Sequence, residues 1–116
     1  MYMKLVAVLL VFFGEAFSIL AELAASKGVA ANSSNYLSIF FWASLLVVVG
    51  GAMLVGGYML GYLHLKNIWI IAAISVGSIL VVEPIVAFIL FRQMPTLGAT
   101  IGLILGALGT LSALFL

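Results

Sequence analysis

The sequence predicts an all-α integral membrane protein, a single domain of four transmembrane helices over residues 1–116. Hydrophobic residues make up 67% of the chain and charged residues 6%, and the mean hydropathy is +1.47. So few polar side chains cannot cover a soluble globule of this size. The apolar residues also form four long runs, and a spanning helix needs about 20 such residues. These runs do not alternate as the strands of membrane barrels do, so helices remain the way to satisfy the backbone in lipid.

The first two spans are expected over residues 3–25 and 36–63. Span 1 is predicted to end at the Ser-Lys-Gly sequence 26–28, because a basic residue followed by glycine is typical of a helix end. The polar run 32–35 is expected to be a loop, whose last two residues can cap the next helix. Span 2 is longer than a minimal span, which implies a tilt or an interfacial first turn.

The third and fourth spans are expected over residues 67–91 and 95–116. Span 3 contains Pro84, which removes one backbone hydrogen bond and strains Glu83 before it. Span 4 begins with Pro95, which a first helical turn tolerates. Short connections make consecutive helices antiparallel neighbours. We therefore expect an antiparallel bundle with both termini on the same side.

The few basic residues divide evenly between the two sides of this bundle. Lys4 and Lys66 lie on the side of the termini, and Lys27 and Arg92 lie on the other. Because the two sides carry equal numbers of basic residues, the positive-inside rule predicts no preferred orientation. Either external factors orient the chain, or it inserts both ways up, or the balance arises by chance in a protein with few charges.

One ionisable side chain in the middle of span 1 is the leading functional candidate. Glu15 lies within a continuous apolar run, and a carboxyl at such depth in a membrane indicates function by default. It is either held neutral by a serine or backbone partner, or it takes up and releases a proton. Ser18 and Glu22 share its helix face. Ser18 is a possible donor to a proton- and substrate-binding site, whereas Glu22 is shallow enough to be solvated.

Span 3 supplies the other polar candidates. Glu83 is either functional or structural, since a protonated carboxyl can satisfy the carbonyl freed by Pro84 or pair with a basic residue. Ser75 and Ser78 can line a cavity, although serine in a membrane helix more often bonds its own backbone. The expected proton- and substrate-binding residues are therefore Glu15, Ser18, Ser75, Ser78 and Glu83.

Span 4 carries a row of glycines at strict four-residue spacing, Gly98, Gly102 and Gly106. Small residues in such a row let two helix backbones approach closely. The row predicts a helix contact, within the chain or with a second chain. Gly57 and Gly61 form a shorter and weaker version of this signal in span 2.

The sequence lacks the residues that several kinds of chemistry require. The chain has no cysteine and one histidine, so we expect no metal site and no cofactor. The sequence also lacks the nucleophile-elbow, phosphate-loop and zinc-protease motifs. We expect no catalytic residues, no enzyme activity and no nucleic-acid partner.

The whole arrangement resembles the small multidrug resistance family and its relatives in the drug/metabolite transporter superfamily. Glu15, followed by Ser26 and Gly28, is similar to the family's glutamate with a serine and a glycine at the end of the helix. The stretch 91–97, with Gly102, resembles the join between spans 3 and 4.

Other segments depart from the drug-exporting members. Residues 82–87 are more similar to the glutamate-proline segment of the larger ten-helix relatives and of the small lipid-carrier flippases. Typical drug exporters have a tryptophan-serine-glycine motif in span 3 with a proline-x-glycine ahead of it. Here the chain has Ser-Val-Gly at 75–77 and Asn-Ile-Trp at 67–69.

The resemblance implies an antiparallel dimer in which two Glu15 side chains near the midplane exchange protons and substrate by alternating access. The partner is a second copy or a paralogue. The first expected function is proton-coupled export of small hydrophobic cations or amphiphiles across a prokaryotic inner (plasma) membrane. The second is a flippase for a polyprenyl-phosphate-linked sugar or a similar lipid. The third is a non-transporting membrane subunit of a larger complex.

Overall fold

The computed structural model describes residues 2–116 as four long helices and one short 3₁₀ turn. In chain order these are α1 (Tyr2–Ala31), η1 (Ser33–Asn35), α2 (Tyr36–Leu65), α3 (Ile68–Phe91) and α4 (Leu97–Phe115). Each of the four α-helices is long and apolar enough to cross a membrane. The prediction of an all-α integral membrane protein with four helices packed as a bundle is confirmed.

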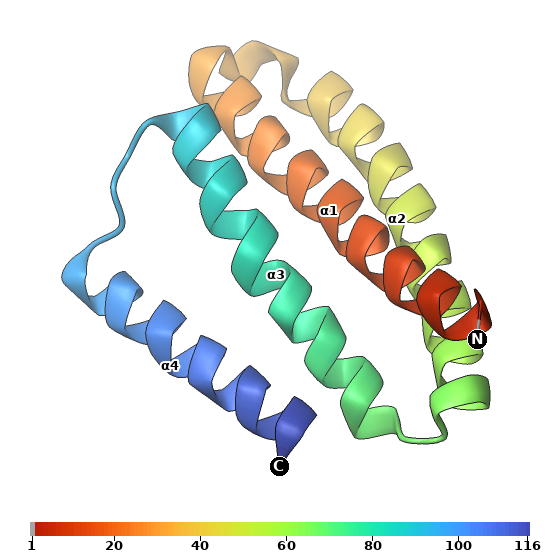
Figure 1. Cartoon of the computed structure of the whole chain (residues 1–116). Helices are drawn as coiled ribbons and strands as arrows, with labels where there is room; N and C mark the ends of the chain where they lie inside the picture. Colours follow the sequence, from red (N-terminus) through yellow and green to blue (C-terminus); the bar gives the residue numbers. More distant parts are fainter. Residues whose placement is uncertain (1) are drawn as a thin grey trace.

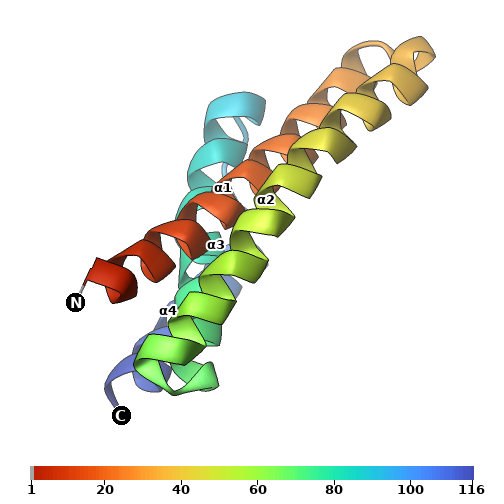
Figure 2. The same cartoon turned by 90° about the vertical axis from the view of Figure 1, so that its right-hand side faces the viewer.

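The four helices form a shallow layer with α1 near its centre. Successive helices run in opposite directions, and both termini lie at the same end (Figure 1). α1 packs against both α2 and α3, whereas α4 packs only against α3 among the described residues. The layer measures 47 × 33 × 17 Å, and the pair α1 and α2 is inclined to the pair α3 and α4 (Figure 2). α4 therefore lies at an open edge.

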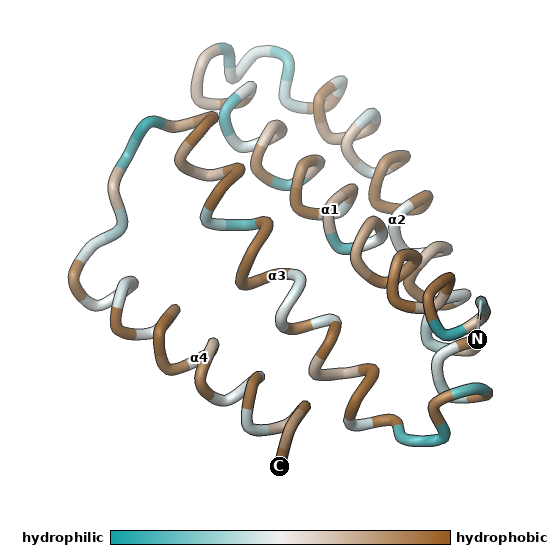
Figure 3. Tube along the Cα trace, in the orientation of Figure 1, coloured by the Kyte–Doolittle hydropathy of each residue, from teal (hydrophilic) through white to brown (hydrophobic). Residues whose placement is uncertain are grey.

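Hydrophilic residues gather at the two ends of the bundle, and most of each helix is apolar (Figure 3). The topology places Lys4 and Lys66 at the end that holds the termini and Lys27 and Arg92 at the opposite end. Lys66 and Arg92 end α2 and α3 in the left-handed conformation, with φ of 58° and 55°. A basic residue at a helix C-terminus is favourable for the helix dipole.

Glycines of α1 and α2 let the two helix backbones approach closely. A Cβ added to either Gly14 or Gly50 would lie 2.8 Å from the carbonyl oxygen of the other residue. Seven residues along α2, a Cβ on Gly57 would lie 3.0 Å from the backbone nitrogen of Val11. Backbones approach this closely only where side chains are absent. The pairing of α1 with α2 is therefore fixed by backbone contact.

The prediction that the first helix ends at residues 26–28 is wrong. α1 continues through this sequence to Ala31. Gly28 does not adopt the positive φ of a glycine helix end, and it faces Ile39 of α2, whose Cδ1 would lie 3.2 Å from an added Cβ. The glycine here serves helix packing, which a helix-end signal in the sequence does not reveal.

The polar loop before α2 caps its helix differently from the prediction. Asn32 accepts a hydrogen bond from the backbone N–H of Ser34 at 3.2 Å and so caps η1. Asn35, which directly precedes α2, makes no capping hydrogen bond with its side chain. The cap therefore lies one turn earlier than expected, at the start of the 3₁₀ turn.

The two prolines also differ in their placement. α3 runs through Pro84 as one continuous helix. α4 begins at Leu97 with Thr96 as its cap, whose side chain accepts a hydrogen bond from the N–H of Ala99 at 3.1 Å. Pro95 thus precedes the helix and does not occupy its first turn.

We expect Gly50→Ala to destabilise the protein, because its methyl group would meet the Gly14 carbonyl. The cost should be about 1–3 kcal/mol, as for overpacked cores. Gly51→Ala is the matched control, since no atom lies within 4 Å of an added Cβ there, and alanine is the better helix former by about 1 kcal/mol. Thermal unfolding in detergent would measure both. Equal stability of the two variants would contradict the backbone contact.

Candidate functional site

A hydrogen bond between Glu15 and Ser75 joins α1 to α3. The Ser75 Oγ donates to the Glu15 Oε1 at 3.0 Å. Ser75 is buried, with 7% of its surface exposed, and Glu15 is partly buried. Within residues 2–116 this is the one side-chain hydrogen bond that joins two α-helices. The carboxyl in the middle of α1 therefore has a defined partner on a neighbouring helix.

The glycine contact explains why Glu15 faces α3. Gly14 is turned toward α2, where it meets Gly50. Each successive residue of an α-helix is rotated by about 100°, so Glu15 lies on the adjoining face of α1. α3 packs on that face and presents Ser75 from its buried side, which also includes Ile71 and Ser78.

The other two candidate serines form hydrogen bonds within their own helices. The Ser18 hydroxyl donates to the carbonyl of Gly14 at 3.0 Å, and the Ser78 hydroxyl donates to the carbonyl of Ile74 at 2.8 Å. Ser18 also lies against Gly50 of α2. Ser78 is buried, with 6% of its surface exposed. Neither hydroxyl bonds Glu15, so of the serine candidates only Ser75 is hydrogen-bonded to it.

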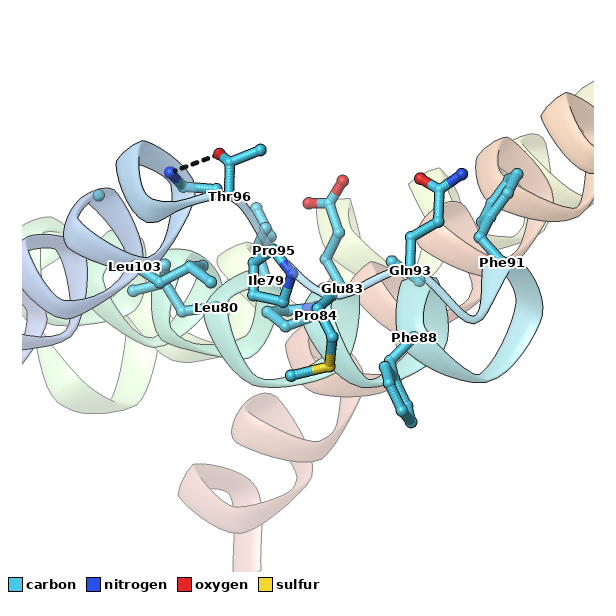
Figure 4. Close-up of a pocket in the computed structure, with 14 residues that line it drawn as sticks. Ile79, Leu80, Glu83, Pro84, Phe88, Phe91, Gln93, Pro95, Thr96 and Leu103 are labelled. Atoms are coloured by element: carbon cyan, nitrogen blue, oxygen red, sulfur yellow. Dashed lines mark hydrogen bonds between the residues drawn. The ribbon is translucent and has the colours of Figure 1, made fainter.

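Glu83 lies on a different part of α3. It is exposed and follows Ser75 by eight residues, which is about 12 Å along a helix. Its carboxylate makes no hydrogen bond to the residues drawn around it in Figure 4. The two acidic candidates, Glu15 and Glu83, therefore occupy separate places in the fold and do not form one paired-carboxylate site.

Glu83 is one of the residues that line a groove of about 570 Å³ between α3 and α4 (Figure 4). Its polar lining residues are Glu83, Gln93 and Thr96. The rest of the lining is largely apolar and includes Leu80, Phe88 and Leu103. The groove thus combines one acidic side chain with two neutral polar side chains and apolar walls.

The glycine row of α4 meets α3 at one end only. A Cβ added at Gly106 would lie 3.0 Å from Leu80 of α3. Gly102 lines the groove, and no atom lies within 4 Å of a Cβ added at Gly102 or Gly98. No residue of α4 is buried. The row therefore makes a close intrachain contact at Gly106 and leaves open space at its other two positions.

No pattern in the sequence assigns a site role to Gly14, Gln93 or Thr96. Gly14 carried a signal, since it directly precedes Glu15 in an apolar span, where glycine is unfavourable for a helix unless packing needs it. Gln93 and Thr96 lie in and beside a connection, and no pattern in the sequence shows that this connection borders a groove.

Comparisons of the chain with protein-family models, with curated proteins and with solved structures found no match. Among residues 2–116, no three His, Asp or Glu side chains come together as a metal site would require. The chain is a four-helix integral membrane protein with four candidate spans, and no family is assigned.

We expect Ser75→Ala to change the environment of the Glu15 carboxyl, because it removes the hydroxyl donor. Ser78→Ala is the matched control, since it removes a buried serine that bonds only its own helix. Infrared spectra of the protein in bilayers would show the carboxyl band, assigned to Glu15 by its loss in Glu15→Gln. The band should shift in Ser75→Ala and stay in place in Ser78→Ala. The same band position in both variants would contradict the hydrogen bond.

Proposed function

We propose that this protein is a small transporter that exports hydrophobic cations or amphiphiles in exchange for protons, working as a dimer by alternating access. The observation that supports this most strongly is the hydrogen bond between Glu15, in the middle of α1, and the buried Ser75 of α3. This bond gives a partly buried carboxyl a defined partner in a chain whose residues are 67% hydrophobic.

A carboxyl group in an apolar environment can couple the transport of protons to the transport of a cationic substrate. In a low-dielectric environment its negative charge is unfavourable unless a proton or a cation neutralises it. A proton and a cationic substrate then compete for the same group, so that release of one accompanies binding of the other. The Ser75 hydroxyl can donate to the carboxyl oxygen in both states and so holds Glu15 toward α3 throughout the exchange.

The shape of the chain favours a second copy or a paralogue as partner. The layer is 17 Å thick in its thinnest direction, which is too thin for four helices to enclose a path for a substrate. α4 has no buried residue and leaves a large apolar surface to the surroundings. The equal number of basic residues at the two ends suits an antiparallel pair.

We propose that this dimer lies in a prokaryotic inner (plasma) membrane, in keeping with the resemblance of Glu15 and residues 91–97 to the small multidrug resistance family.

A second candidate function is that of a non-transporting subunit of a larger membrane complex. The open space at Gly98 and Gly102 on α4 favours it, because small residues on an exposed helix suit contact with another protein. Gentle purification in mild detergent separates the two proposals. An accessory subunit would be recovered with a different protein in a fixed ratio, whereas a transporter would be recovered as pairs of this chain or of close paralogues.

We expect Glu15→Gln to abolish proton release when a lipophilic phosphonium cation is added to the purified protein, because glutamine has no proton to exchange. Glu22→Gln is the matched control, since it removes an exposed carboxyl from the same helix. A pH electrode in weakly buffered detergent solution would measure the release. Full proton release from a folded Glu15→Gln protein would show that Glu15 has a structural role.

We expect the orientation of the chain to be mixed, or to be changed by a single added charge, because two basic residues lie at each end. Paired C-terminal reporter fusions, one active on each side of the membrane, would measure it. One added lysine after the C-terminus should move the balance toward one side. A strong preference that no added charge changes would contradict an antiparallel dimer of identical chains.

A further inference from the structure

We propose that the groove between α3 and α4 is a second binding site, separate from Glu15, for a small hydrophobic amine that enters from the bilayer. This site would take its ligand whether or not Glu15 exchanges protons. The proposal rests on the carboxyl group of Glu83, on the lining of the groove and on the way α4 packs.

Glu83 has no basic partner among the described residues that line the groove. It precedes Phe91, the last residue of α3, by eight residues, which places it about 12 Å inside the helix end. An ionised carboxylate at such depth is costly in a membrane unless it is paired. The basic residues nearest in sequence are Lys66 and Arg92, and neither lines the groove. A cation brought by a ligand would supply the missing partner.

The residues that line the groove suit an amphiphilic ligand that carries its charge at one side. Gln93 and Thr96 border the groove near Glu83 (Figure 4). The Thr96 oxygen accepts a hydrogen bond from Ala99, and the Gln93 carbonyl oxygen is an acceptor for an ammonium group. Phe88 and Leu103 offer apolar surface to the remainder of the ligand. The volume of about 570 Å³ is in the range of sites for drug-sized molecules, about 300–1,000 Å³.

The same lining disfavours a ligand that bears phosphate. The groove has fourteen lining residues, and none of them is lysine or arginine. A phosphate oxygen would be repelled by Glu83 with no cation to hold it. A protonated amine instead gains a charge-assisted hydrogen bond to Glu83. A phosphate-linked lipid is therefore a poor ligand for this groove.

The position of α4 leaves the groove accessible from the lipid. Gly106 packs on Leu80 of α3, whereas Gly102, one turn closer to the connection, lines the groove and has no neighbour within 4 Å of an added Cβ. The two helices thus diverge toward the connection 92–96, which Figure 1 shows as an extended segment. α4 contacts no other helix of the described chain, so no other described helix of this chain closes this opening.

The test uses dodecylamine with a photoactivatable diazirine in its chain, added to the protein in phosphatidylcholine nanodiscs. Mass spectrometry would locate the labelled residues after illumination. We expect saturable labelling of the groove walls, including Leu103, and an apparent affinity lower by about tenfold or more in Glu83→Gln, since a hydrogen bond to a charged group contributes about 1.5–3 kcal/mol. Glu22→Gln, which removes an exposed carboxyl outside the groove, should label the groove walls as the wild type does. The uncharged dodecanol analogue should show no dependence on Glu83.

Leu103→Trp provides a second variant, which fills the groove without touching Glu83, in case Glu83→Gln does not fold. It should also lose the saturable labelling. Labelling that is equal in the wild type and in folded Glu83→Gln, or equal for the amine and the alcohol, would overturn the proposal. Cross-links between two copies at the groove walls, in place of ligand labelling, would overturn it too. The effect of Glu15→Gln on proton release tests the transport proposal independently.

Discussion

The backbone contact between Gly14 and Gly50 is the constraint on which the rest of the structure depends. Because neither residue has a side chain, α1 and α2 lie closer together than any other residue pair would permit. This contact fixes which face of α1 is turned to α2. Glu15, the next residue, is then presented to α3, where Ser75 donates to it. In lipid the apolar surface gives no preference for one helix face over another, so such close contacts decide how the helices pair.

α3 contributes residues both to the Glu15–Ser75 contact and to the groove that Glu83 lines. Its buried side offers Ser75 to Glu15, and its exposed side carries Glu83 into the groove beside α4. Along α3, Glu83 lies eight residues, or about two turns, from the Ser75 that is bonded to Glu15. If both sites bind ligands, a movement of α3 is the direct physical route by which one would affect the other. The edge helix α4, held only by α3, would follow such a movement.

The four membrane-spanning helices and their alternating directions could be predicted from the sequence, because long apolar runs can be recognised without a fold. The sequence was insufficient for the pairing of Glu15 with Ser75, since periodicity shows which residues share a helix face but not which helix that face meets. The regular glycine row of α4 predicts a helix contact, but a Cβ added at Gly98 or Gly102 would meet no atom within 4 Å. Gly14 and Gly50 belong to no such row, yet they bring the backbones of α1 and α2 together. The helix end expected at residues 26–28 was wrong because Gly28 packs against α2 and stays helical. The roles proposed for Glu15 and Glu83 remain predictions.

The proximity of Glu15 to Ser75 is the feature on which the proposed proton exchange depends most directly. Solid-state NMR of the labelled protein in bilayers can detect it as a correlation between the side-chain carboxyl carbon of Glu15 and the Cβ of Ser75. Glu15→Gln would assign the signal, because the chain has only three glutamates. We expect this correlation to be present at a mixing time that reports direct neighbours. A Glu15 carboxyl that correlates with Ser18 and not with Ser75 would contradict the placement of the carboxyl between α1 and α3.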